Sequence, residues 1–428
     1  MKNFQIILIA VFIAAAIFGM LIFSGAIPLG NKTVGGQGTI VLWGTFRADL
    51  VNTLLEDFNN AHPSYVVRYV EKSREDFDQN LLEALASGSG PDMFFLPDNL
   101  AYHYSNKILA IPYQSYSVSS FKSSFASAGE VFLTSGGILA FPMTVDPLVM
   151  YYNRSMLDAS GIVYPPNNWD DFVNVVPALT KKDDSNKIIK SAVALGHFSN
   201  VFHAKDILST LFMQTGNKIV YEKDGRFVPD LTVSIGPFGL DNILKFYTDF
   251  ADPQKNVYSW NKSFPLSQDY FSTDNLAFYF GYASELSTLV SKNPNQNFSV
   301  AEMPQIKGSG FKLTSARVTG LAISAFSKNS TTAFLALSDM SSGDFVSKLA
   351  KNLGVVPARR DLLAIKQNDA YSPIFYSSAL YARSWLDPSP KDMDDIFRRM
   401  IDGVLANNFG PGDAIIDANS KLYLLLNK

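Results

Sequence analysis

The sequence predicts an α/β protein built on a parallel sheet. Three β-rich runs between residues 39 and 96 alternate with two stretches of helical periodicity. The third run, residues 93–96 (MFFL), is entirely apolar, which is typical of a strand buried on both faces. This β-α-β-α-β order indicates parallel strands with helices on both faces of the sheet. Ligands of such sheets bind beyond the carboxyl ends of the strands, so the loops after Thr45 and Leu96 are expected to face a site.

Each element of this first unit has a basis in the sequence. Residues 39–45 (TIVLWGT) form the first β-rich run, and leucines at helical spacing follow over 50–58. Residues 65–70 are β-rich again. A second helical pattern over 77–85 stops at Gly88, a residue that commonly ends helices because it adopts the left-handed conformation.

The remainder continues the alternation of strands and helices. Strand-like runs are expected at 138–142, 148–152, 275–280, 298–302 and 318–324. Helical patterns are expected at 168–180, 201–213 and 240–250, and over most of the chain beyond 331.

Composition narrows the functional classes. The chain has 428 residues, of which 47% are hydrophobic and 18% charged, so about 150 residues per domain would allow two or three folded units. It contains no Cys and only 4 His, which argues against disulfides, thiolate sites and His-rich metal sites, and we expect no cofactor or metal. Its net charge of -3 provides no basic field of the kind that attracts nucleic acid.

The first residues are a separate segment. Residues 6–23 are uninterrupted apolar sequence, which as a helix would extend ~27 Å, close to the thickness of a bilayer core. We therefore expect a transmembrane signal anchor within 1–29, followed by a flexible glycine-rich tether at 30–38. A cleaved signal peptide is the alternative, since 24–26 (SGA) resembles a cleavage site. Lys2 favours a cytoplasmic amino terminus, so either interpretation places the rest of the chain outside the cell or in the periplasm.

Five stretches, in order, resemble a known family. They are 39–46 (TIVLWGTF), 85–97 (LASGSGPDMFFLP), 138–162 (ILAFPMTVDPLVMYYNRSMLDASGI), 277–286 (AFYFGYASEL) and 319–340 (TGLAISAFSKNSTTAFLALSDM). Together they resemble the extracellular solute-binding proteins of ABC importers, in the sugar-binding class that includes maltose-binding protein. The lipid-bearing Cys usual in that family is missing, which puts lipid anchoring in doubt.

The resemblance implies a two-lobed fold of the type II periplasmic-binding-protein kind, with a hinge between the lobes. Lobe 1 would comprise 39–146 plus 298–340, and lobe 2 would comprise 147–297 plus 341–428. The chain would cross between lobes near 146–152, near 298–304 and around Met340. Ligand would lie between the lobes, where contacts from both can favour a closed form.

A sugar site needs flat aromatic platforms for C–H faces and planar polar groups for hydroxyls. The candidate platforms are Trp43, Phe46, Trp260, Tyr282 and Trp385, each with core packing as the alternative. The candidate polar contacts are Asp98, Asp146, Glu285, Thr319 and Gly320, with Arg317 a weaker one. Asp98 could instead cap a helix, and Asp146 could simply form a turn before Pro147. Trp169 and all four His are expected to have structural or surface roles.

The resemblance also implies the function. We expect a monomeric, membrane-tethered, extracellular protein that binds a carbohydrate and delivers it to an ABC permease, without enzymatic activity. A ligand sensor, or a binding protein for a non-sugar solute, remains open. A secreted glycan hydrolase is a further alternative, but it would need two carboxylates ~5 to 9.5 Å apart across a cleft, and no motif pairs them.

Overall fold

The structure is a computed structural model that describes residues 38–232 and 239–427. The expected anchor at 1–29 and nearly all of the tether at 30–38 lie outside the described residues. Within the described part of the chain, no helix combines the length and apolar character needed to cross a bilayer.

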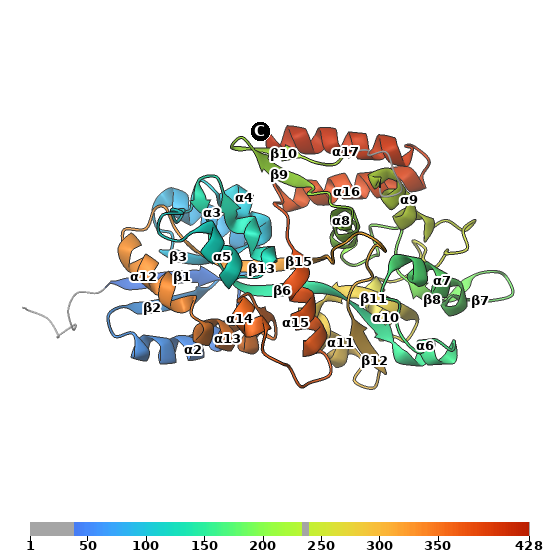
Figure 1. Ribbon diagram of the computed structural model, residues 1–428, viewed down its shortest axis with the longest axis horizontal. Coiled ribbons are helices and arrows are strands. Elements are labelled where there is room, and N and C mark those ends of the chain that lie inside the picture. The colour runs from blue at the N-terminus through green and yellow to red at the C-terminus, as the bar shows by residue number, and fades with distance from the viewer. Residues whose placement is uncertain (1–37, 233–238, 428) are drawn as a thin grey trace, which may run out of the picture.

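The described chain forms two α/β lobes that share one continuous sheet (Figure 1). The strands of lobe 1 are β1 (Thr39–Gly44), β2 (Val66–Glu71), β3 (Met93–Pro97), β4 (Leu133–Thr134), β5 (Gly137–Ile138) and β14 (Val356–Pro357). Its helices are α2 (Ala48–Ala61), α3 (Phe77–Ser87), η1 (Asp98–Leu100), α4 (Ala101–Tyr104), α5 (Val118–Ser124), η2 (Ser127–Phe132), α12 (Ser330–Met340), α13 (Gly343–Leu353) and α14 (Arg360–Leu363).

Lobe 2 contains a second set of strands and helices. Its strands are β7 (Lys181–Lys182), β8 (Ile188–Val193), β9 (Val220–Lys223), β10 (Arg226–Pro229), β11 (Leu276–Tyr282) and β12 (Phe298–Ala301). Its helices are α6 (Arg154–Ala159), α7 (Trp169–Leu179), α8 (Ala204–Gln214), α9 (Leu240–Asp249), α10 (Ser267–Ser272), η3 (Ala283–Glu285), α11 (Leu286–Lys292), α16 (Pro390–Leu405) and α17 (Pro411–Leu426). The elements that join the lobes are β6 (Phe141–Asn153), β13 (Thr314–Ile323), α15 (Ser372–Tyr381) and β15 (Ala382–Arg383).

The predicted parallel unit is confirmed in lobe 1. Strand β1 pairs in parallel with both β2 and β3, with Thr39 opposite Val66 and Leu42 opposite Met93. Helix α2 buries the apolar face that its spacing predicts, and α3 ends at Gly88 in the left-handed conformation (φ 70°). The sheet continues through β13 and β6 in the order β2-β1-β3-β13-β6.

The lobe 2 sheet is built on the far half of β6. It has the order β6-β11-β8-β7, with β11 antiparallel to β6 and parallel to β8. Helix α7 begins after Asn168, whose side chain accepts a hydrogen bond from the Asp171 amide, as its sequence predicts. Its Trp169 packs edge-on against Phe172 and Phe280, which agrees with the packing role expected for it.

The expected division into lobes needs correction at two places. Strand β12 pairs with residues 150–153 of β6, in lobe 2, so the chain returns to lobe 1 along β13 and not at 298–304. Helix α13 belongs to lobe 1, because its buried apolar face packs on α2, with the rings of Phe345 and Phe58 5.3 Å apart. The third crossing therefore follows α14 and not Met340.

Candidate functional site

The carboxyl ends of strands from both lobes converge on the middle of β6 and β13. Pro97 at the end of β3 lies opposite Thr319, and Tyr282 at the end of β11 lies opposite Leu148. Strands β3 and β11 therefore point at each other from the two lobes. The shared strands between them place Arg317 of β13 directly opposite Asp146 of β6. This convergence is where the sequence predicts ligand to bind.

Arg317 is the exposed cation at this convergence. Its side chain is 51% exposed although it stands on a central strand, so it is accessible to solvent. The guanidinium carbon lies 3.8 Å from the centroid of the Tyr282 ring, a cation–π contact. Its Nη2 lies 3.2 Å from His203 Nδ1 and 3.5 Å from Asp206 Oδ2. Nε and Nη1 make no hydrogen bond within the described residues, which leaves them to donate to a ligand.

His203 supports Arg317 from lobe 2. It precedes α8 with a positive φ of 63°, and its side chain is only 6% exposed. Nε2 lies 2.5 Å from Glu285 Oε1, and Nδ1 lies 3.6 Å from Asp206 Oδ2. Burial alone would lower the pKa of His203, but hydrogen bonds and charges from Asp206 and Glu285 outweigh it and raise the pKa above its ordinary value.

Glu285 is saturated by its own lobe. Its carboxylate accepts hydrogen bonds from the Tyr279 hydroxyl (2.5 Å), Gln268 Nε2 (2.6 Å) and the Tyr282 amide (3.0 Å), in addition to His203. Burial opposes its ionisation, but the charge and hydrogen bond of His203, together with the hydrogen bonds from Tyr279 and the Tyr282 amide, outweigh burial and lower the Glu285 pKa. The contacts assign Glu285 to bracing lobe 2, although the sequence suggested a ligand contact.

Asp98 and Asp146 lie on the two sides of Arg317, and each is braced by a serine. The Ser384 hydroxyl and the Asn99 amide donate to Asp98. The amide and hydroxyl of Ser284 donate to Asp146, at 2.9 and 2.6 Å. Burial raises the pKa of both carboxyls, and that of Asp98 reaches about 6. The hydrogen bonds and the charge of Arg317 act in the opposite direction but do not cancel the effect of burial.

The raised Asp98 pKa predicts a loss of stability as pH rises. The folded protein holds a proton on Asp98 up to about pH 6, whereas the unfolded chain releases it near 3.8. Ionisation of the buried carboxyl therefore costs folding about 2–3 kcal/mol across pH 4 to 7. Urea unfolding of wild type and Asp98→Asn at several pH values should show this decline in wild type and a smaller one in the variant. Equal declines would contradict the prediction.

Three of the five candidate aromatics are half-buried and have free surface. Trp43 is the penultimate residue of β1 and has the Lys72 ammonium 3.7 Å from its ring centroid. Phe46 contacts Phe95 edge-on at 5.0 Å. Trp385 directly follows Ser384, the donor to Asp98, and stacks on Phe397. These rings remain candidates for ligand contact.

The other two aromatics are core residues in this structure. Trp260 is 0% exposed, its rings packed against Phe264 and Tyr270 and its Nε1 donating to Asn200 Oδ1. Tyr282 is 1% exposed, with the Arg317 guanidinium over its ring and the His203 ring edge-on at 4.8 Å. A ligand at this position would therefore meet Arg317 and not the Tyr282 ring.

Gly320 packs closely against protein atoms, and the ligand contact expected of Thr319 stays a prediction. A Cβ on Gly320 would lie 2.7 Å from the Ala140 Cβ and 2.8 Å from the Phe132 ring, so the absent side chain admits η2 and not a ligand. Thr319 is half-buried between Pro97 and Thr144, at the convergence.

The sequence patterns ranked Arg317 low, predicted only a structural or surface role for His203, and did not single out Asp206, Ser284 or Ser384. Single serines and a lone His carry no motif, and only the pairing of distant strands brings them together. The sequence held one signal for the serines: Ser284 lies between the candidates Tyr282 and Glu285, and Ser384 precedes the candidate Trp385.

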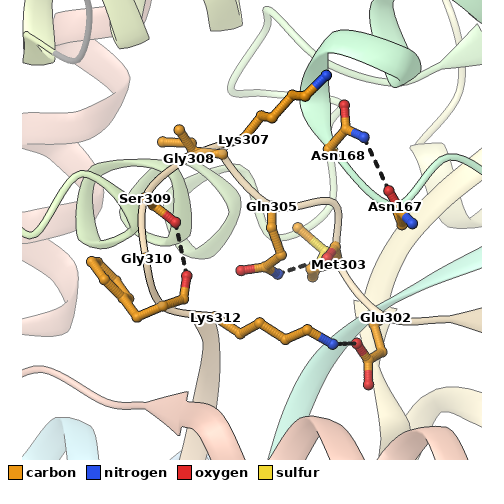
Figure 2. Close-up of a pocket in the computed structure, with 12 residues that line it drawn as sticks. Asn167, Asn168, Glu302, Met303, Gln305, Lys307, Gly308, Ser309, Gly310 and Lys312 are labelled. Carbon is orange, nitrogen blue, oxygen red and sulfur yellow. Dashed lines mark hydrogen bonds and ion pairs between the residues drawn. The ribbon is translucent and has the colours of Figure 1, made fainter.

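A cavity of about 540 Å³ lies elsewhere, in lobe 2 (Figure 2). It is formed by the start of α7 and the loop 302–312, and the Lys312 ammonium lies 2.8 Å from Glu302 at its edge. None of the converging groups around Arg317 lines it. Among residues 38–232 and 239–427, no group of three or more His, Asp or Glu is arranged so that it could hold a metal ion.

Known proteins share this fold. The cyclo/maltodextrin-binding protein in complex with maltotetraose has a TM-score of 0.73 at 17% identity, over 91% of this chain and 97% of that one. The cyclic α-maltosyl-1,6-maltose-binding protein of Arthrobacter globiformis also scores 0.73, at 14% identity over 91% and 99%. A solute-binding protein of an ABC transporter from Thermotoga lettingae, bound with α-D-tagatose, scores 0.66 at 19% identity over 91% and 100%.

Sequence comparison gives the family. A binding protein of Brucella abortus (strain 2308) is 21% identical over 364 residues, which is 82% of this chain and 83% of that protein. Residues 47–342 match the family described as bacterial extracellular solute-binding protein. That match covers well over half of the sequence, so the chain belongs to the bacterial extracellular solute-binding protein family.

Proposed function

We propose that the protein is the extracellular substrate-binding component of an ABC importer and binds an uncharged saccharide between its lobes. The observation that carries this is the set of planar polar groups gathered from both lobes around Arg317. Acceptors and donors alternate there, as the rim of a sugar requires. Trp43, Phe46 and Trp385 supply apolar surface for C–H faces.

The charge of the site favours an uncharged ligand. Four carboxylates surround one guanidinium, and His203 provides at most one further positive charge. The four are Asp98, Asp146, Asp206 and Glu285. Phosphate or a uronic acid would meet an excess of negative charge, whereas hydroxyls can both donate to the acids and accept from Arg317. The maltotetraose, tagatose and cyclic maltosyl-maltose ligands of the structural neighbours are uncharged saccharides as well.

Binding, and not hydrolysis, suits the state of the acids. Each carboxylate accepts hydrogen bonds from protein groups: Asp98 from Ser384, Asp146 from Ser284, and Glu285 from His203. Asp206 lies close to His203 and Arg317. A retaining or inverting glycosidase needs a protonated acid, which Asp98 could supply below about pH 6, and a second, free carboxylate on the opposite side of the bond. Asp146, Asp206 and Glu285 are all held by protein groups. The shared strands instead suit a hinge that closes on a ligand.

The proposal includes delivery at a membrane. The apolar run at 6–23 would anchor the chain, and the glycine-rich stretch at 30–38 would tether the lobes beside a permease. Tethering raises the effective concentration at the transporter, so a monomer with modest affinity suffices.

A glycan panel tests the function directly. The full chain in detergent should show a raised melting temperature and a change in Trp fluorescence with a neutral mono- or oligosaccharide. At 100 times Kd the ligand should add about 2.7 kcal/mol to the free energy of unfolding. Arg317→Gln should weaken the response, and uronic acids of matched size should give none. A response only to uronic acids or sugar phosphates would refute the proposed ligand class.

A further inference from the structure

His203 stands between two alternative hydrogen-bond partners. Its Nε2 faces the Glu285 carboxylate at 2.5 Å, and an ionised carboxylate only accepts, so Nε2 carries a proton in either charge state. The variable atom is Nδ1. It lies 3.2 Å from Arg317 Nη2 and 3.6 Å from Asp206 Oδ2.

The two partners require opposite states of Nδ1. Arg317 Nη2 can only donate, so its contact is a hydrogen bond when Nδ1 has a free lone pair and His203 is neutral. A protonated Nδ1 would donate to Asp206 and would repel the guanidinium. The Nη2 atom itself lies 3.5 Å from Asp206, so the imidazole and the guanidinium compete for one carboxylate.

We propose that His203 is a positioning residue whose protonation controls where the Arg317 guanidinium lies in the ligand site. When His203 is neutral, Nδ1 holds Nη2 over the Tyr282 ring and aims Nε and Nη1 between the lobes. When His203 is charged, Nδ1 turns to Asp206 and Arg317 is released toward solvent. Regulation of saccharide affinity by pH follows from this and rests on the proposed function.

The surroundings shift this equilibrium toward the charged imidazole, since the pKa of His203 lies above its ordinary value. The charged and titratable groups that face His203 are Glu285 on η3, Asp206 on α8, Arg317 on β13 and Tyr282 at the end of β11. Two carboxylates favour the charged imidazole, whereas burial and the guanidinium oppose it. Lys205 forms ion pairs with Asp387 and Asp394. The pKa values of Lys205 and of Tyr282 both lie above their ordinary values, so neither group titrates together with His203.

The sign of the pH effect follows. A ligand that uses Arg317 binds the neutral form of His203 better, so affinity should be lower at acid pH and rise to a plateau above the His203 pKa. Loss of a hydrogen bond that holds a charged donor should reduce affinity about tenfold. By linkage, saturating ligand should lower the His203 pKa.

The test compares two histidine variants. In His203→Asn the amide oxygen can accept from Arg317 at every pH, and Asn tolerates the positive φ of this position. His103→Asn, at an exposed position on α4, is the matched control. Saccharide Kd measured from pH 5 to 9 should rise about tenfold toward acid in wild type and in His103→Asn. In His203→Asn the rise should be much smaller, because it then comes from Asp98, whose pKa is about 6, and not from position 203. The same pH dependence in all three would overturn the proposal.

A second measurement needs neither a ligand nor a variant. In the full chain with labelled His and Arg, the Arg317 Nε–H signal should shift with the same apparent pKa as the His203 ring. A His203 titration that leaves the Arg317 signal unmoved would overturn the proposal. If no saccharide binds, the proposed function fails while this titration still decides the role of His203.

Discussion

Replacing Glu285 by Leu should lower the free energy of unfolding by about 3–5 kcal/mol, the range for breaking a buried charge pair. Four donors lose their common acceptor: His203, Tyr279, Gln268 and the Tyr282 amide. The leucine has nearly the same volume, so the loss reports on unpaired polar groups and not on a cavity. Urea unfolding at neutral pH, followed by far-ultraviolet circular dichroism, measures it.

Two further variants serve as controls for Glu285→Leu. Glu285→Gln keeps an acceptor and the side-chain shape and should lose less. Glu302→Leu, also in lobe 2, removes a partly exposed acid that pairs with the exposed Lys312 and accepts a hydrogen bond from the Ser377 hydroxyl. The loss of both contacts should cost less, at about 1–2 kcal/mol. If Glu285→Leu proves as stable as wild type but binds saccharide poorly, Glu285 is a ligand contact, as the sequence suggested.

Replacing Trp260 by Ala should be similarly severe, at about 3–5 kcal/mol. The indole is fully buried between Phe264 and Tyr270, so its removal leaves a large cavity. The side-chain oxygen of Asn200 also loses the Nε1–H that donates to it. Thermal and urea unfolding of the purified chain measure this.

Trp43→Ala is the matched control for this variant. Trp43 is only half-buried near the end of β1, beside Lys72, so its loss should cost about 1 kcal/mol or less in stability while weakening saccharide binding. Similar stability losses in the two variants would mean that Trp43, too, is a core residue.

Local sequence patterns predicted the first half of the fold well. The apolar strands and spaced leucines between residues 39 and 97 determine a parallel unit, because each connection is short and each helix has one apolar face. The division between lobes was less predictable. Helix α13 is amphipathic wherever it packs, and only the matching surface on α2 shows that it belongs to lobe 1.

The position of the candidate site follows from the topology, but only some of its residues could be predicted from the sequence. Topology placed it at the strand ends, and Asp98, Asp146 and Thr319 are there. Composition could not show that the ring of Tyr282 would lie beneath Arg317, since 35 residues separate them in the chain. Nor could it separate Trp43 from Trp260, because an indole suits a core and a sugar platform equally well.

The two strands common to both lobes have a consequence for how the molecule unfolds. Residues 141–147 of β6 pair with β13 in lobe 1, while residues 148–153 pair with β11 and β12 in lobe 2. Neither lobe is therefore a segment that could be excised and expressed alone, since each would lose a central strand. If either lobe unfolds, the other loses strand pairing along β6. The described chain should therefore unfold in a single cooperative transition, although it has two lobes.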